Sequence, residues 1–239
     1  FMPKLFFLLF SYETIQIHKS FFLQPFVSNN FASGCKKKVG DDDNTNAPTN
    51  VIVHTAGHNN ASMVWWKGTS ATQLAVIPYG RGEIKGMAFA NNNAYIVGFD
   101  NDYAQAILWT NGQRQQLSSG LNRAEARCIA VDGQDVYVAG YEETSPSWSA
   151  TVWKNKQPQV IPGFSAIDNI KVMNGKMYVL GFFRDTLLYR TPTQTVRLSG
   201  VAKSMFVDGT DVYVCGEDKN QAVYWKNGQR NVLSNNPGA

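Results

Sequence analysis

Short apolar runs alternate with turn signals along the chain from Val51 to Leu233. Around the middle of the chain, Asp132-Gly133 is followed by Val136-Tyr137-Val138-Ala139-Gly140 and then by a run that ends in Trp153. Asp-Gly and Asn-Gly pairs favour tight hairpins because they adopt the positive φ angles that these turns require. β-branched and aromatic runs favour strands. The pattern therefore predicts four short strands per unit, and no stretch of similar length has helical periodicity.

The unit is repeated. Its second strand carries a Tyr-x-x-Gly motif, and its third strand ends in a large aromatic residue. The motif occurs at Tyr95–Gly98, Tyr137–Gly140, Tyr178–Gly181 and Tyr213–Gly216, with His54–Gly57 as a degenerate first copy. The aromatic positions are Trp66, Trp109, Trp153, Tyr189 and Trp225. A period of about 40 residues with four strands per unit is typical of a β-propeller blade.

We therefore predict an all-β fold, a β-propeller of four-stranded blades, in preference to a β-sandwich of irregular strands. Five blades are expected at about residues 51–80, 83–118, 124–162, 165–199 and 201–233. The first is expected to lack its inner strand, since polar sequence precedes Val51. Two alternatives follow: a five-bladed ring with one three-stranded blade, or part of a larger propeller that continues beyond Ala239. We favour the second, because residues 234–239 do not have a strand pattern that could close the ring.

One large ring per blade is most simply a wedge that packs between neighbouring sheets. A row of ligand-stacking aromatic residues is the alternative. The repeated glycines are expected at turns or close approaches of the backbone. Cys128 and Cys215 fall in blades that are not neighbours, which predicts two small apolar thiols and no disulfide between them.

The N-terminal segment differs from the repeats. Residues 1–34 combine a basic start, short apolar runs and a small-residue end, as a secretory signal peptide does. The sequence Ala32-Ser33-Gly34-Cys35 resembles the lipobox of bacterial lipoproteins, a resemblance that implies lipidation of Cys35. Residues 35–50 are polar and are expected to form a disordered tether. The propeller domain is assigned to 51–239, and the membrane is an expected partner through the lipid.

Charge and composition argue against several kinds of partner and functional site. The net charge of +4 is small and scattered, which argues against nucleic acid as a partner. Only His54 and His58 follow the leader, and no zinc, calcium, phosphate-loop or serine-hydrolase motif is present. We therefore predict no cofactor, no metal site and no catalytic residue.

One column of residues is a candidate binding site. Four residues before the last apolar residue of each first strand, the chain has Lys85, Arg127, Asp168 and Lys203. First strands line the channel of a propeller, so three cations there predict a positive field that attracts an anionic ligand. The simpler alternative is that these side chains are solvated or paired with Asp168, Glu83 or Glu125.

A second column follows the repeated glycine, at Asn59, Asp100, Glu142 and Asp218, with Phe183 in the fourth unit. These residues are predicted to be solvated loop residues.

The succession of Asp-Gly, Val-Tyr-Val-Ala-Gly and Trp-Lys-Asn resembles repeat propellers of bacterial envelope lipoproteins and, more distantly, the NHL class. The resemblance implies a fold and a location at the outer membrane or cell surface, but no activity. We predict a lipid-anchored, non-enzymatic binding or scaffold module for a glycan or protein. The alternative is a glycan-active hydrolase or lyase with its site at the channel mouth.

Overall fold

The computed structural model describes residues 7–9, 53–59, 62–76, 82–100, 105–144 and 147–234. These residues form five four-stranded antiparallel sheets, each made of strands consecutive in sequence. The first sheet comprises β1 (Phe7–Leu9), β2 (His54–Asn59), β3 (Ser62–Lys67) and β4 (Ser70–Val76). The second comprises β5 (Gly82–Ala90), β6 (Asn93–Asp100), β7 (Gln105–Thr110) and β8 (Gln113–Gln116). The third comprises β9 (Ala124–Asp132), β10 (Asp135–Thr144), β11 (Ser147–Lys154) and β12 (Gln157–Val160). The last two comprise β13 (Ala166–Met173), β14 (Lys176–Phe183), β15 (Thr186–Arg190) and β16 (Thr195–Leu198); β17 (Val201–Asp208), β18 (Asp211–Asp218), β19 (Gln221–Lys226) and β20 (Gln229–Ser234).

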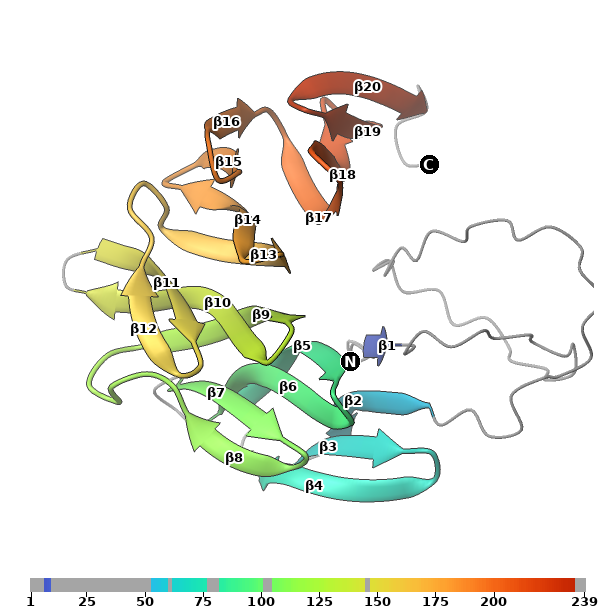
Figure 1. Ribbon diagram of the computed structural model, residues 1–239, viewed down its shortest axis with the longest axis vertical. Helices are drawn as coiled ribbons and strands as arrows, with labels where there is room; N and C mark the ends of the chain where they lie inside the picture. Colours follow the sequence, from blue (N-terminus) through green and yellow to red (C-terminus); the bar gives the residue numbers. More distant parts are fainter. Residues whose placement is uncertain are drawn as a thin grey trace, which may run out of the picture.

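The sheets follow one another around an arc, with the first strand of each sheet on the inside and the fourth on the outside (Figure 1). Consecutive inner strands are in contact, β5 with β9, β9 with β13 and β13 with β17. The first and fifth sheets lie at the two ends of the arc and are not side by side in Figure 1. The predicted all-β repeat is confirmed, with five four-stranded sheets, and the fold is propeller-like.

One prediction about the first unit is wrong. Its sheet has four strands, because β1 pairs with β2 through Phe7–Ala56, Leu8–Thr55 and Leu9–His54. This strand comes from residues 7–9, far in sequence from β2, so the polar sequence directly before Val51 could not indicate it. Cys35, the proposed tether and the other residues of the N-terminal 1–50 segment lie outside the described part of the chain.

Neighbouring sheets pack face to face, and three of the repeated tryptophans lie between them, whereas Trp66 in the first sheet is half-buried. Trp109, Trp153 and Trp225 are almost fully buried. Each packs against the preceding sheet: Trp109 belongs to the same core cluster as Met63, for example, and Trp153 to that of Leu108. The wedge interpretation is therefore confirmed for these three rings.

Tyr189 does not belong to this column. Trp153 is opposite Val138, two residues before Gly140, whereas Tyr189 is opposite Leu180, one residue before Gly181. A shift of one residue turns a strand side chain to the other face of the sheet. The ring of Tyr189 accordingly packs in the core between the fourth and fifth sheets, and Arg190 occupies the register position of the tryptophan.

The Asn of the Trp-Lys-Asn pattern stabilises a hairpin. Asn155 has a positive φ of 48°, and its side-chain oxygen accepts a hydrogen bond from the backbone N–H of Val136 at 2.9 Å. Its amide group donates to Asp135 at 2.7 Å, and Lys154 forms an ion pair with the same carboxylate. The fifth sheet repeats this arrangement around Asn227. The pattern therefore joins the turn after the third strand to the turn before the second.

A β-bulge recurs in the inner strand of four sheets. The pairing register between first and second strands shifts by one residue at Lys85, Arg127, Asp168 and Lys203. On the opposite strand the shift faces the repeated glycine. A methyl group on Gly140 would overlap with the carbonyl oxygen of Glu125, and Gly98, Gly181 and Gly216 meet equivalent carbonyls. The Tyr-x-x-Gly glycine is therefore required because the bulged strand approaches its Cα.

We expect Gly140→Ala to lower the free energy of unfolding by about 3 kcal/mol, because backbone atoms on both strands must move. Gly133→Ala is the matched control: Gly133 lies in a turn with φ of 61°, and nothing lies near an added methyl group. It should cost only about 1 kcal/mol from the strained φ. Urea unfolding followed by far-UV circular dichroism measures both. Equal losses would contradict the bulge explanation.

Candidate functional site

The four residues predicted as a ligand-binding column are the four bulge residues. Lys85, Arg127, Asp168 and Lys203 each occupy the extra position of β5, β9, β13 and β17. A bulge inserts one residue that has no partner across the ladder and re-aims its side chain. The column therefore lies at the same register position of four inner strands that contact one another in succession.

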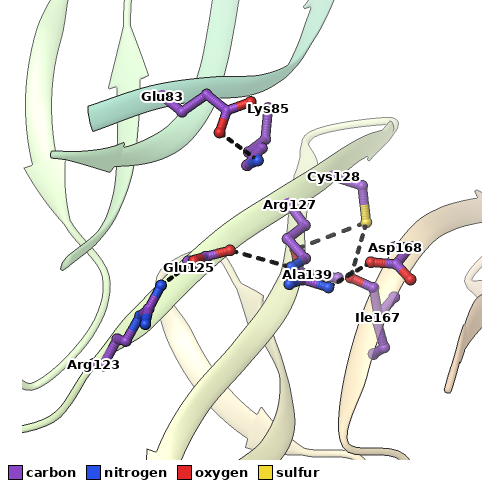
Figure 2. A network of polar contacts seen from close by, with 9 residues as sticks. All are labelled: Glu83, Lys85, Arg123, Glu125, Arg127, Cys128, Ala139, Ile167 and Asp168. Atoms are coloured by element: carbon purple, nitrogen blue, oxygen red, sulfur yellow. Dashed lines mark hydrogen bonds and ion pairs between the residues drawn. The ribbon is translucent and has the colours of Figure 1, made fainter. Parts of the chain in front are cut away.

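Arg127 is the centre of a network between the third and fourth sheets (Figure 2). Its Nη1 donates to Asp168 at 2.7 Å, and its Nε donates to Glu125 at 3.3 Å. Glu125, which is buried, also accepts a bond from Arg123 at 3.2 Å. The guanidinium is thus fixed by carboxylates from two neighbouring sheets.

The other two cations of the column are not joined to this network by a described contact. Lys85 forms an ion pair of 2.6 Å with Glu83 in its own strand. Lys203 is exposed and, within the described residues, forms neither a hydrogen bond nor an ion pair. The structure therefore brings Arg127 and Asp168 together and neutralises two of the three cations that were predicted to create a positive field.

Aromatic rings lie beside the bulge cations. The residue after the repeated glycine is Phe99, Tyr141 or Phe182 in the second, third and fourth sheets. The Lys85 ammonium lies 5.7 Å from the centre of the Phe99 ring. The Arg127 guanidinium lies 4.9 Å from the centre of Tyr141 and 5.9 Å from that of Phe182. Such contacts add an attraction of about 0.5–1 kcal/mol each at partly exposed sites.

Burial and charge shift three groups in this region. Burial alone would lower the pKa of Arg127, but the charges of Asp168 and Glu125 outweigh it and raise the pKa. Burial, followed by the adjacent Glu125 carboxylate, raises the pKa of Tyr141 to about 12. Burial also raises the pKa of the Cys128 thiol well above its usual value, so this cysteine is not a nucleophile at neutral pH. Cys128 and Cys215 are free thiols, as predicted.

The second predicted column is partly wrong. Asp100 and Asp218 lie at the ends of β6 and β18 and are buried, rather than solvated in loops. The Asp100 carboxylate accepts two hydrogen bonds from Arg114 at 2.6 and 2.8 Å. Asp218 accepts two from Arg230, at its carboxylate (2.5 Å) and at its backbone carbonyl (3.2 Å). These pairs connect the second strand to the fourth strand of the same sheet. Their cationic partners, Arg114 and Arg230, come from the fourth strands, β8 and β20.

Two further searches are limited to the described residues. Among them, no group of three or more His, Cys, Asp or Glu side chains is arranged to hold a metal ion. Within the same ranges, no helix has the length and apolar character needed to cross a bilayer.

Comparisons with known proteins give no family. No protein-family model matches the chain, and no curated protein matches it. Among solved structures, a chain in the crystal structure of the mitotic checkpoint complex matches with 7% identity and a TM-score of 0.39. The match covers 79% of this chain and 77% of the other. A likeness at this level carries no argument about function.

The raised pKa of Tyr141 predicts an alkaline transition. Because the folded state holds the phenol proton more tightly, Tyr141 contributes stability below pH 10 that is lost as the pH rises towards 12. Tyr141→Phe should remove this contribution, so that its stability falls less steeply across that interval than that of the wild type. Denaturant unfolding at pH 9, 10 and 11 measures the difference. Parallel curves for the two proteins would contradict the assigned environment of Tyr141.

Proposed function

We propose that this chain is a binding or scaffold module, lipid-anchored at a bacterial outer membrane or cell surface, and not an enzyme. The observation that carries the proposal is the coincidence of the bulges with the variable charged column. One repeated backbone device presents Lys85, Arg127, Asp168 and Lys203 at equivalent positions of adjacent inner strands. A constant frame that presents different side chains suits recognition of a glycan or a protein.

The glycan-active hydrolase or lyase is the weaker alternative. Such an enzyme commonly uses two carboxyl groups, one to donate a proton and one to act as base or nucleophile. Glu125 and Asp168 do converge, but on the guanidinium of Arg127, which hydrogen-bonds to both. Glu125 is also buried and bonded to Arg123. Carboxylates engaged in this way support a rigid charged surface better than they support proton transfer.

Lys203 provides the sharpest test of the column. Because it is exposed and unpaired among the described residues, Lys203→Ala should change stability by less than about 0.5 kcal/mol. We expect it to weaken binding to an acidic glycan about fivefold to tenfold, the loss of about 1 kcal/mol. An array of acidic and neutral glycans, followed by titration with the best acidic probe, measures the effect.

Lys176→Ala is the matched control, since Lys176 is also exposed but follows the Asn174-Gly175 turn at the other end of the strands. It should bind as the wild type does. Arg127→Lys keeps a charge but loses the fork that holds two carboxylates, and should also weaken binding. Unchanged binding in both the Lys203 and Arg127 variants would refute the column as the binding site.

The anchor is tested separately. If Cys35 is lipidated, cleavage before it would also remove β1, and the first sheet of the mature chain would consist of β2, β3 and β4. The full chain expressed in a bacterium should then be found in the membrane fraction, and Cys35→Ser should move it to the soluble fraction. Incorporation of labelled palmitate is the direct measurement. A Cys35→Ser protein that remains with the membrane and a wild-type protein that takes up no label would contradict lipidation.

A further inference from the structure

Among the described residues, the β10–β11 hairpin of the third sheet is longer than the equivalent hairpins of the second, fourth and fifth sheets. Its second strand, β10, continues for four residues past the repeated glycine, Gly140, and ends at Thr144. In the second, fourth and fifth sheets the equivalent strands end two residues after their glycines, at Asp100, Phe183 and Asp218. The β10–β11 hairpin therefore has two rows of cross-strand pairs, Glu143–Trp148 and Thr144–Ser147, beyond the last β14–β15 pair of the fourth sheet.

The first of these two rows contains an exposed tryptophan. Trp148 is opposite Glu143 and diagonal to Tyr141, whose own partner is Ala150. Diagonal neighbours on one face of a sheet are within reach of aromatic side chains. The rings of Trp148 and Tyr141 are stacked, with centres 4.6 Å apart and an angle of 7° between their planes. Tyr141 is 1% exposed and Trp148 is 42% exposed, so the buried ring supports the exposed one.

Tyr141, which supports Trp148, is itself in contact with Arg127. The guanidinium of Arg127 lies 4.9 Å from the centre of the Tyr141 ring and is itself held by Glu125 and Asp168. An isolated exposed aromatic residue needs no explanation. Trp148 differs because its orientation is fixed by a buried ring and by an arginine anchored on two sheets. A side chain fixed in this way loses little conformational entropy when a ligand binds.

The polar side chains of Arg123 and Glu143 lie on the same face of the third sheet as the indole of Trp148. The backbone N–H of Glu143 donates to the carbonyl of Arg123 at 2.7 Å, which extends the ladder across to Trp148. Cross-strand partners point to one face of a sheet. The Arg123 side chain is 54% exposed and bonds Glu125 through one Nη atom, which leaves other N–H groups for a ligand. Glu143 offers carboxylate oxygens as acceptors.

From this arrangement we propose that the extended end of the β10–β11 hairpin binds a pyranose ring, with Trp148 as the platform under the ring and Arg123 and Glu143 as its hydrogen-bonding partners. The face of an indole is negative, so it attracts the polarised C–H groups on the flat side of a pyranose. Guanidinium and carboxylate groups then bond the hydroxyl groups at the rim of the sugar. The inference rests on the proposed binding function and specifies its ligand as a carbohydrate.

The test uses the full chain and defined oligosaccharides, one set of neutral hexoses and one containing hexuronic acids. Ligand titrations follow tryptophan fluorescence and are repeated by isothermal calorimetry. Trp148→Ala should weaken binding at least about tenfold, as expected for loss of an aromatic anchor. Trp148→Phe, which keeps an aromatic face, should weaken it less. Because Trp148 is partly exposed, both variants should retain the wild-type circular dichroism spectrum.

Phe183→Ala is the matched control. Phe183 is 44% exposed, lies at the end of β14 in the adjacent hairpin, and is contacted by Arg184 instead of by the Arg127 network. This variant should bind as the wild type does. Arg123→Ala should weaken binding in addition, and more strongly for hexuronic acids than for neutral sugars if the guanidinium bonds a carboxylate.

The outcomes separate this inference from the proposed function. Sugar binding that is lost in Trp148→Ala and kept in Phe183→Ala supports the platform. Sugar binding that is unchanged in Trp148→Ala but weakened in Lys203→Ala refutes the platform and leaves the column as the binding site. A wild-type chain that binds none of the oligosaccharides at millimolar concentration also refutes the platform, while binding of a protein ligand would still support the module.

Discussion

The contact between a bulged inner strand and a glycine on the next strand determines this structure. In four sheets the extra residue brings a backbone carbonyl onto the Cα of the repeated glycine, at Gly98, Gly140, Gly181 and Gly216. Only a residue without a side chain tolerates that approach. The same bulge bends each inner strand at one register position and sends one side chain out of the ladder there. The repeated unit, its Tyr-x-x-Gly glycine and the charged column therefore all depend on the same backbone bulge.

Much of the architecture could be predicted from the sequence because it depends on local chemistry. Asp132-Gly133 marks a hairpin turn, and the Trp153 position marks a buried face, since each is determined by turn geometry or burial within one unit. The column was found by alignment alone: Lys85 and Arg127 share a position, although nothing in their spacing indicates that the position is a bulge. The bulge becomes visible only in the pairing of β5 with β6 and of β9 with β10.

The errors have physical reasons as well. Tyr189 was aligned with the tryptophans because it is aromatic, but a one-residue difference in pairing turns it to the opposite face. The sequence predicts a loop at Asp100, because its partner, Arg114, lies in a strand with little apolar pattern. The repeat does not indicate Trp148, because this residue occurs in one unit alone, in the extended β10–β11 hairpin, and has no equivalent in the other units. Strand β1 comes from residues remote in sequence and outside any repeat.

The side chain at the bulge varies from sheet to sheet, whereas the backbone around it does not. Because the inserted side chain has no cross-strand partner, the position accepts lysine, arginine or aspartate while the ladder around it is unchanged. A substitution there changes the surface charge and leaves the strand pairing in place, although at Arg127 it also removes one partner of the buried Glu125 carboxylate. A substitution of the facing glycine disrupts two strands. Each of the four copies therefore carries one position whose residue differs while the backbone around it stays the same. A change of one codon at such a position changes the charge of the surface and leaves the pairing of the strands as it is.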